Sequence, residues 1–241
     1  MLVLLPPSET KADGGDGPPL DLDALSFPQL TPVRRKLADA LVSLADDVHA
    51  TLAALKLTEG QTAEVTRNRT LHTSPTLPAL RRYTGVLYDA LDISGMSRPQ
   101  RRRAEARLAV ASALFGVVRG ADPIPAYRLS GGSVLPSVGP LRALWRPALE
   151  PALAETGLLV DLRSGPYAAL ASPPNAVTVR VVDAERRLAI SHFNKAHKGR
   201  LARALALAPR VPGTVTGLLR TAARAGFRLE RTGARALDLI V

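Results

Sequence analysis

The apolar residues of this chain change their spacing along its length, and this change constrains the fold more than any other feature. Between residues 31 and 56, apolar side chains stand at positions 37, 41, 44, 48, 52 and 55, which is the spacing of one stripe along a helix. Between residues 158 and 241, short runs rich in Val, Leu and Ile have the length and composition of strands. Because helices and strands are interspersed without strict alternation, the sequence predicts an α+β fold.

Proline and glycine divide the rest of the chain into short segments. We expect strands over 1–5, 158–162, 177–182, 188–190 and 237–241, helices over 31–56, 77–91, 99–115, 141–155, 195–207 and 215–225, and a surface loop over 131–140. The sequence has no internal repeat and no run long enough to link independent domains. We therefore expect a single compact domain of mixed short strands and helices over residues 1–241.

Cysteine is absent, which excludes a disulfide framework, thiolate metal sites and cysteine catalysis. No apolar run approaches the roughly 18 to 20 residues of a membrane span, and the apolar opening is too short for a signal peptide. The glycine patterns of nucleotide-binding enzymes and the signatures of zinc proteases and serine hydrolases are also absent. We expect a cytoplasmic protein that does not associate with membranes, and we predict no cofactor and no metal.

Basic residues exceed acidic ones by 32 to 21, a net charge of +11, and the excess is unevenly distributed. Residues 1–60 and 141–190 have net charges of −4 and +1, whereas residues 61–140 and 191–241 have net charges of +6 and +8. Two basic blocks of this kind favour a surface that binds a polyanion. The alternative is a compositional bias, since only 5 of the 32 basic residues are Lys.

The first basic cluster lies at the start of the helix expected over 195–207. It comprises Lys195, Lys198, Arg200 and Arg203. A helix N-terminus favours anions, so these cations are candidates for binding phosphate or carboxylate, although a solvated basic helix face is the alternative. The neighbouring His192 and His197 are five residues apart, which suits neither one helical face nor a usual metal pair.

The second basic cluster comprises Arg98, Arg101, Arg102 and Arg103, shortly after a turn at Gly95. A helix, a tight glycine turn and a basic helix form the helix-hairpin-helix element, whose turn amides and flanking cations bind DNA phosphates. The usual hairpin has two glycines and this one has only Gly95, so a plain helical hairpin is the alternative.

Two polar loops contain candidates for proton transfer and anion binding. Glu9 and Lys11 follow the first expected strand, a usual position for active sites in sheets. A proline-rich segment presents Asp122, Tyr127 and Arg128. Glu9, Lys11, Tyr127 and Lys195 are therefore candidate catalytic residues, and Arg128 is a candidate anion-binding residue. A polar turn and a structural Asp–Arg pair are the alternatives.

Six segments in this order resemble the YaaA family of bacterial peroxide stress proteins. They are residues 4–11 (LLPPSETK), 83–91, 114–129, 141–145, 161–167 and 194–203. Ser130 and Pro166 stand where the family pattern has acidic residues. The resemblance implies a cytoplasmic protein linked to oxidative stress, with DNA binding through a helix-hairpin-helix element. Residues 91–107 are the best physical match to that element.

These observations predict a stress protein that binds DNA mainly through phosphate contacts of basic helices, with little sequence specificity. The alternative is an enzyme acting on a small anionic substrate, such as a carboxylate, phosphate or amide. Its pocket would be built from the segments Pro-Ser-Glu-Thr-Lys at 7–11, Tyr-Arg-Leu at 127–129 and Lys-x-x-Lys-Gly at 195–199. The expected partners are thus DNA and a small anionic ligand.

Overall fold

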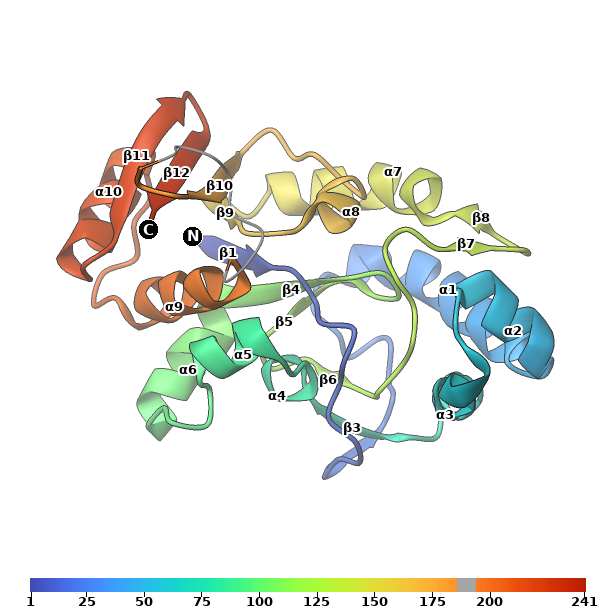
Figure 1. Cartoon of the computed structure of the whole chain (residues 1–241). Coiled ribbons are helices and arrows are strands. Elements are labelled where there is room, and N and C mark those ends of the chain that lie inside the picture. Colours follow the sequence, from blue (N-terminus) through green and yellow to red (C-terminus); the bar gives the residue numbers. More distant parts are fainter. Residues whose placement is uncertain (186–193) are drawn as a thin grey trace.

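A seven-stranded sheet forms the centre of the computed structural model, which describes residues 1–185 and 194–241 (Figure 1). Its strand order is β11–β12–β10–β9–β1–β4–β5. The strands are β1 (Leu2–Leu5), β4 (Leu108–Ser112), β5 (Gly116–Arg119), β9 (Leu159–Asp161), β10 (Ala176–Val182), β11 (Arg228–Gly233) and β12 (Ala236–Ile240). The five strands from β12 to β4 are parallel, and β11 and β5 are antiparallel strands at the two edges.

The parallel strands are buried, and this burial explains why the strand predicted over 1–5 is confirmed and the helix predicted over 99–115 is partly wrong. Every residue of β1, β4 and β9 is buried, so these segments read as apolar runs rather than alternating ones, with Ser112 and Asp161 as polar residues at the ends of β4 and β9. The prediction for 1–5 is confirmed. The helix predicted over 99–115 is wrong beyond Arg107, because α6 (Arg98–Arg107) ends there and β4 follows. A short buried strand and a buried helix segment cannot be told apart by periodicity alone.

Two other predicted helices are interrupted. Residues 31–56 form α1 (Thr31–Leu44) and α2 (Val48–Leu55), because the Asp47 carboxylate accepts a 2.9 Å hydrogen bond from the Ala50 amide and starts a new helix. Residues 77–91 form the end of β3 (Pro75–Pro78), then α4 (Ala79–Arg82) and α5 (Val86–Leu91). Gly85 separates the last two helices with a φ of 96°, a conformation that favours glycine.

The second half of the chain follows the prediction more closely. The predicted helices match α7 (Leu141–Ala154), α9 (Asn194–Leu207) and α10 (Val215–Arg224), and the predicted strands match β9, β10 and β12. Strand β11 was not predicted, and the strand expected over 188–190 lies outside the described residues. The remaining elements are β2 (Gly17–Pro19), η1 (Pro28–Leu30), η2 (Glu59–Gln61), α3 (Thr62–Arg69), β6 (Pro123–Ile124), β7 (Val134–Leu135), β8 (Gly139–Pro140) and α8 (Gly165–Ala168).

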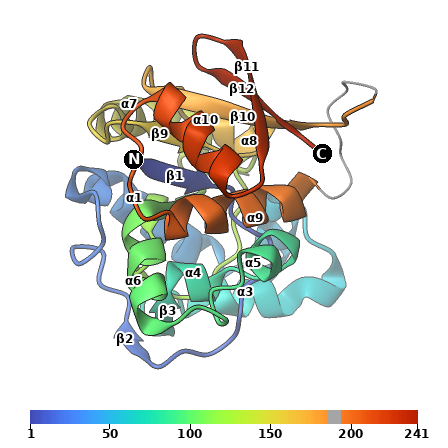
Figure 2. The ribbon, with the colours of Figure 1, turned by 90° about the vertical axis from the view of Figure 1, so that its left-hand side faces the viewer.

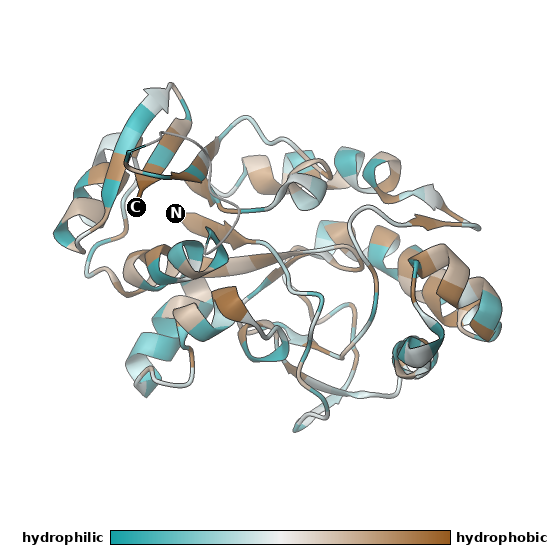
Figure 3. Ribbon diagram, viewed as in Figure 1, coloured by the Kyte–Doolittle hydropathy of each residue, from teal (hydrophilic) through white to brown (hydrophobic). Residues whose placement is uncertain are grey.

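One hydrophobic cluster joins the sheet to its covering helices and includes residues from Leu2 to Leu239. Hydrophobic residues concentrate in the central strands, whereas α6 is largely hydrophilic (Figure 3). The predicted compact α+β domain is therefore confirmed. Within residues 1–185 and 194–241, no helix is both long and apolar enough to cross a bilayer.

Gly199 allows α9 to lie against α5. A Cβ atom at this position would collide with the carbonyl oxygen of Leu87 and lie 2.9 Å from the Cβ of Ala90. Helix α9 also packs against β1 and α6, so this close crossing fixes the helix that carries Lys195 and Lys198. The glycine of the Lys-x-x-Lys-Gly segment therefore has a packing role.

We expect Gly199→Ala to lower the free energy of unfolding by about 2 kcal/mol, because the new methyl group overpacks this crossing. Urea denaturation followed by the fluorescence of the single tryptophan measures this change. Gly213→Ala is the control, since a Cβ atom there meets nothing within 4 Å. Equal effects of the two substitutions would contradict the packing role.

Candidate functional site

The loops that follow β1, β4 and β9 meet at one edge of the sheet, since parallel strands end there together. After β1, the chain adds β4 on one side and later β9 on the other, so the strand order reverses at β1. The carboxyl edge at such a reversal is where ligands bind in open sheets. Glu9 and Lys11 follow β1, Ser112 ends β4, and Tyr167 lies just beyond β9 in α8.

Lys11 is buried beneath its own loop and two tyrosine rings. Its Nζ lies 4.4 Å from the ring centroid of Tyr127 and 5.5 Å from that of Tyr83. It donates hydrogen bonds to the carbonyl oxygens of Ser8, at 3.2 Å, and Glu9, at 3.4 Å. No carboxylate among the described residues pairs with the amine. Burial lowers the Lys11 pKa to about 8, against the opposing charge of Glu9.

A chain of hydroxyl groups continues from the tyrosines into the sheet. The hydroxyls of Tyr83 and Tyr127 are 2.8 Å apart, and that of Tyr127 lies 2.7 Å from the Oγ of Ser112. The amide of Phe115 donates to this Oγ at 2.9 Å. Burial raises the pKa of Tyr83 to about 12 and that of Tyr127 well above its ordinary value. Both phenols therefore stay protonated at neutral pH and can donate hydrogen bonds.

Arg128 is fixed at two places. The carbonyl of Arg128 accepts a 2.9 Å hydrogen bond from the side-chain amide of Asn68, whose Oδ1 accepts a 2.8 Å hydrogen bond from the Arg128 N–H. The guanidinium pairs with the Glu9 carboxylate at 3.0 Å, and the Ser130 hydroxyl donates to the same carboxylate at 2.9 Å. The structure thus brings two predicted residues, Glu9 and Arg128, together.

A cavity of about 340 Å³ opens beside this ion pair, and we call it the Arg128 cavity. Its lining consists of Glu9, Ala54, Leu55, Lys56, Arg128, Ser130, Gly131, Gly132, Ser133, Pro166 and Tyr167. Two cations, one carboxylate, hydroxyl groups and an aromatic ring surround a volume suited to a small molecule. Asp122 does not belong to this site. Its carboxylate binds Ser26 and the backbone of Arg119, in a structural role.

The third predicted segment has different contacts. Lys198 is buried and donates to the carbonyl oxygens of Leu162, at 3.0 Å, and Arg163, at 3.4 Å. Burial lowers its pKa, although the charge of Asp161 opposes this effect. Lys198 thus attaches α9 to the loop after β9. Arg203 donates to the carbonyl of Leu91, whereas Lys195 and Arg200 are exposed, and His192 lies outside the described residues.

The predicted helix-hairpin-helix element corresponds to α5, a turn and α6. In this turn the Gly95 amide donates to the Asp92 carboxylate at 2.9 Å, which also pairs with Arg203 at 3.2 Å. The turn amide that was expected to bind phosphate therefore has an internal partner, and the DNA-binding hairpin stays a prediction. On α6, Arg98 and Arg102 are exposed, and Arg101 and Arg103 are half-buried.

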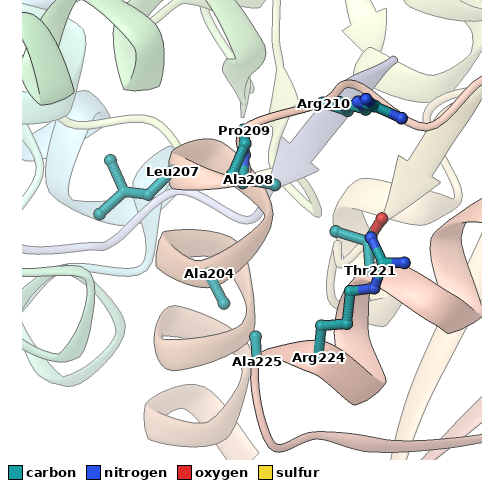
Figure 4. Close-up of a pocket in the computed structure, with 8 residues that line it drawn as sticks. All are labelled: Ala204, Leu207, Ala208, Pro209, Arg210, Thr221, Arg224 and Ala225. Carbon is teal, nitrogen blue, oxygen red and sulfur yellow. The ribbon is translucent and has the colours of Figure 1, made fainter.

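A second cationic site lies between α9 and α10. It is a hollow of about 720 Å³ lined by Ala204, Leu207, Ala208, Pro209, Arg210, Thr221, Arg224 and Ala225 (Figure 4). An adjoining hollow of about 220 Å³ adds Arg220 to the same arginines. We call the two hollows together the α9–α10 groove. Helices α6, α9 and α10 face the same side of the molecule (Figure 2).

The sequence reasoning missed Asn68, Arg82 and the groove residues Arg210, Arg220 and Arg224. One signal for the groove was readable, because residues 194–228 contain eight Lys and Arg and no acidic residue. Nothing in the sequence distinguishes Asn68, whose partners are the backbone atoms of a distant residue. Over the described part of the chain, no group of three or more His, Asp and Glu residues could hold a metal ion.

Comparisons with known proteins agree over nearly the whole chain. A family model described as "Peroxide stress protein YaaA" matches residues 1–231. The chain is 46% identical over 239 residues to a UPF0246 protein of Corynebacterium efficiens, with 95% of each chain covered. It is 44% identical over 238 residues to one of Corynebacterium glutamicum, also with 95% of each covered. A UPF0246 protein of Streptomyces coelicolor is 44% identical over 239 residues, with 95% of this chain and 92% of the relative covered.

Proposed function

The chain belongs to the YaaA family of peroxide stress proteins, and on this premise we propose that it acts in the cytoplasm by binding the phosphates of DNA. The observation that carries the proposal is the basic stretch of residues 194–228, which has eight Lys and Arg and no acidic residue. This stretch forms α9 and α10 and the groove between them. Such a surface attracts a polyanion without regard to base sequence.

The groove suits phosphate chemically. Arg210 and Arg224 line both of its hollows, and Arg220 lines the smaller one. A guanidinium group can donate two parallel hydrogen bonds to one phosphate, which a lysine ammonium cannot do. Ala204, Ala208 and Thr221 leave room between the helices, so a strand of phosphates can approach the arginines closely.

Helix α6 extends this surface. Arg107 donates to the carbonyl oxygens of Ala206, at 3.0 Å, and Ala208, at 2.5 Å, where α9 ends at the groove. Burial and the neighbouring Arg103 guanidinium lower the pKa of Arg107. The earlier candidates Arg98, Arg101, Arg102 and Arg103 on α6, and Lys195 and Arg200 on α9, are proposed as further phosphate contacts.

We expect the triple variant Arg210→Ala, Arg220→Ala and Arg224→Ala to weaken duplex binding at least about tenfold for all sequences alike. The measurement is fluorescence anisotropy of a labelled duplex of about 30 base pairs across a series of salt concentrations. For the unaltered protein, the slope of log affinity against log salt concentration should be near −4 to −5. In the triple variant this slope should be shallower by about 2 to 3, because three phosphate contacts are removed.

A charge-matched control replaces Arg35, Arg142 and Arg146, which are exposed on α1 and α7, by alanine. This control should keep most of the affinity because the net charge alone steers binding only weakly at physiological salt. Equal weakening in both triple variants would contradict the groove assignment. Affinity that does not change with salt, or no binding at low salt, would contradict DNA binding through phosphates.

The second candidate function is an enzyme that acts on a small anionic substrate at the carboxyl edge of β1. The observation that favours it is Lys11, a buried amine without a carboxylate partner among the described residues and beside two protonated phenols. A lysine in such an environment can act as a base or nucleophile near neutral pH. A Lys11 amine that titrates at the ordinary lysine value would contradict this function.

A further inference from the structure

We propose that the Arg128 cavity binds a small molecule through its carboxylate or phosphate group, with Arg128 as the anion receptor and Asn68 as its positioning residue. The proposal rests on the second candidate function and names the site for the anionic part of its ligand. It concerns a different place from the α9–α10 groove. A volume of about 340 Å³ is also too small to hold a nucleic-acid duplex.

The backbone of Arg128 is held by a buried side chain. Asn68 is fully buried, and it uses both ends of its amide on one residue, donating to the Arg128 carbonyl and accepting from the Arg128 N–H. The two hydrogen bonds resemble those between paired β-strands. They fix the backbone from which the Arg128 guanidinium extends. A surface ion pair contributes little to stability by itself, so a buried amide is not required merely to form the Glu9–Arg128 pair.

The guanidinium is oriented but not saturated. One nitrogen, Nη1, pairs with Glu9 at 3.0 Å, and Ser130 holds the Glu9 carboxylate at 2.9 Å. Arginine has five N–H donors. Among the described residues, the Arg128 guanidinium has no acceptor other than Glu9. The side chain lines the cavity and is 18% exposed, so it is accessible to a ligand there. A preoriented and unsaturated guanidinium matches a carboxylate or phosphate.

The rest of the lining complements such a ligand. Lys56 adds a second cation, so the cavity has two positive charges against the single negative charge of Glu9. Gly132 offers a backbone amide and Ser133 a hydroxyl group, whereas the Ser133 amide donates to the carbonyl oxygen of Ser130. Leu55 and the Tyr167 ring form an apolar wall. The matching ligand is a small molecule with one anionic group and a short apolar or planar body.

The test is isothermal titration calorimetry with inorganic phosphate and, separately, with pyruvate as a carboxylate. The triple variant of Arg210, Arg220 and Arg224 is the background, because it removes phosphate sites in the groove. We expect Arg128→Gln to weaken binding at least about tenfold, since it removes charge-assisted hydrogen bonds. Glu9→Gln should instead strengthen binding severalfold, because it removes the negative charge beside the anion. Glu9 is half exposed, so this variant should fold.

A double-mutant cycle tests the role of Asn68. Asn68→Ala should weaken binding about tenfold in the presence of Arg128 and have little further effect beside Arg128→Gln, because Asn68 acts through Arg128. Urea denaturation checks that each variant is folded. Independent effects of the two substitutions would overturn the positioning role. Anion binding that survives Arg128→Gln, or none in the background variant, would overturn the site, whereas an ordinary Lys11 titration would refute only the enzymatic function.

Discussion

Replacing Arg82 by methionine is expected to lower the free energy of unfolding by about 4 kcal/mol, because it leaves one buried and three partly buried carbonyl groups without this donor. Arg82 is fully buried and donates to the carbonyl oxygens of Ala12, Gly14, Pro75 and Ile124. One guanidinium thus joins the loop after β1 to β3 and β6. Urea denaturation followed by the fluorescence of the buried Trp145 measures the loss.

Arg81→Met is the matched control for this prediction. Arg81 is the neighbouring residue of α4, but its side chain is 44% exposed and lies 3.7 Å from Asp16 at the surface. Exposed ion pairs of this kind contribute about 0 to 1 kcal/mol, so the control should change stability little. A difference of less than about 1 kcal/mol between the two variants would contradict the role of Arg82 as an internal connector.

Arg82 also shows why part of the fold could not be predicted from the sequence. The sequence contains two adjacent arginines, one exposed and one buried, and no local pattern distinguishes them. The partners of Arg82 are backbone carbonyls that come together only in the folded chain. Elements with a strong local pattern, such as α7 and α10, were predicted. The sequence predicts a helix where β4 lies, because a fully buried strand has no alternation of apolar and polar residues.

The sequence also predicts part of the candidate site. The loop after β1 and the Tyr-Arg-Leu segment were both singled out, and the structure brings Glu9 to Arg128 and Lys11 to Tyr127. The rule that loops gather at the carboxyl edge of parallel strands applies to Glu9 and Lys11, which follow β1. It does not apply to Tyr127 and Arg128, which follow β6 of the small antiparallel sheet. Lys198 was grouped with them by its charge, but it is buried against the carbonyl of Leu162, a contact that charge does not predict.

The two anion sites differ in a way that separates the two candidate functions. The α9–α10 groove belongs to a stretch with no acidic residue, as a surface for an extended polyanion requires. The Arg128 cavity instead places Glu9 beside its arginine. A carboxylate there opposes nonspecific binding of polyanions and favours a ligand that fits the cavity in detail. Substitutions in the groove and in the cavity should therefore affect different ligands.

The free energy of unfolding of Lys11→Met minus that of the unaltered protein is expected to fall by about 2 kcal/mol between pH 7 and pH 10. The folded-state pKa of Lys11 is lowered by burial from 10.5 to about 8. Between these values the unfolded chain binds a proton that the folded chain lacks, so Lys11 adds stability as the pH rises. Below about pH 8 the folded protein bears the full cost of a buried ammonium, which methionine does not have.

Urea denaturation of both proteins across this pH range gives the difference, in which the titrations of all other groups largely cancel. Lys36→Met is the matched control, since it removes the same charge from the exposed surface of α1. The change in the free energy of unfolding caused by Lys11→Met could follow the change caused by Lys36→Met across the pH range. In that case the Lys11 pKa is not lowered by folding, and the enzymatic candidate loses its principal support. A difference confined to Lys11→Met means that the folded protein holds a partly neutral amine near neutral pH, which can accept a proton, beside protonated phenols that can donate hydrogen bonds.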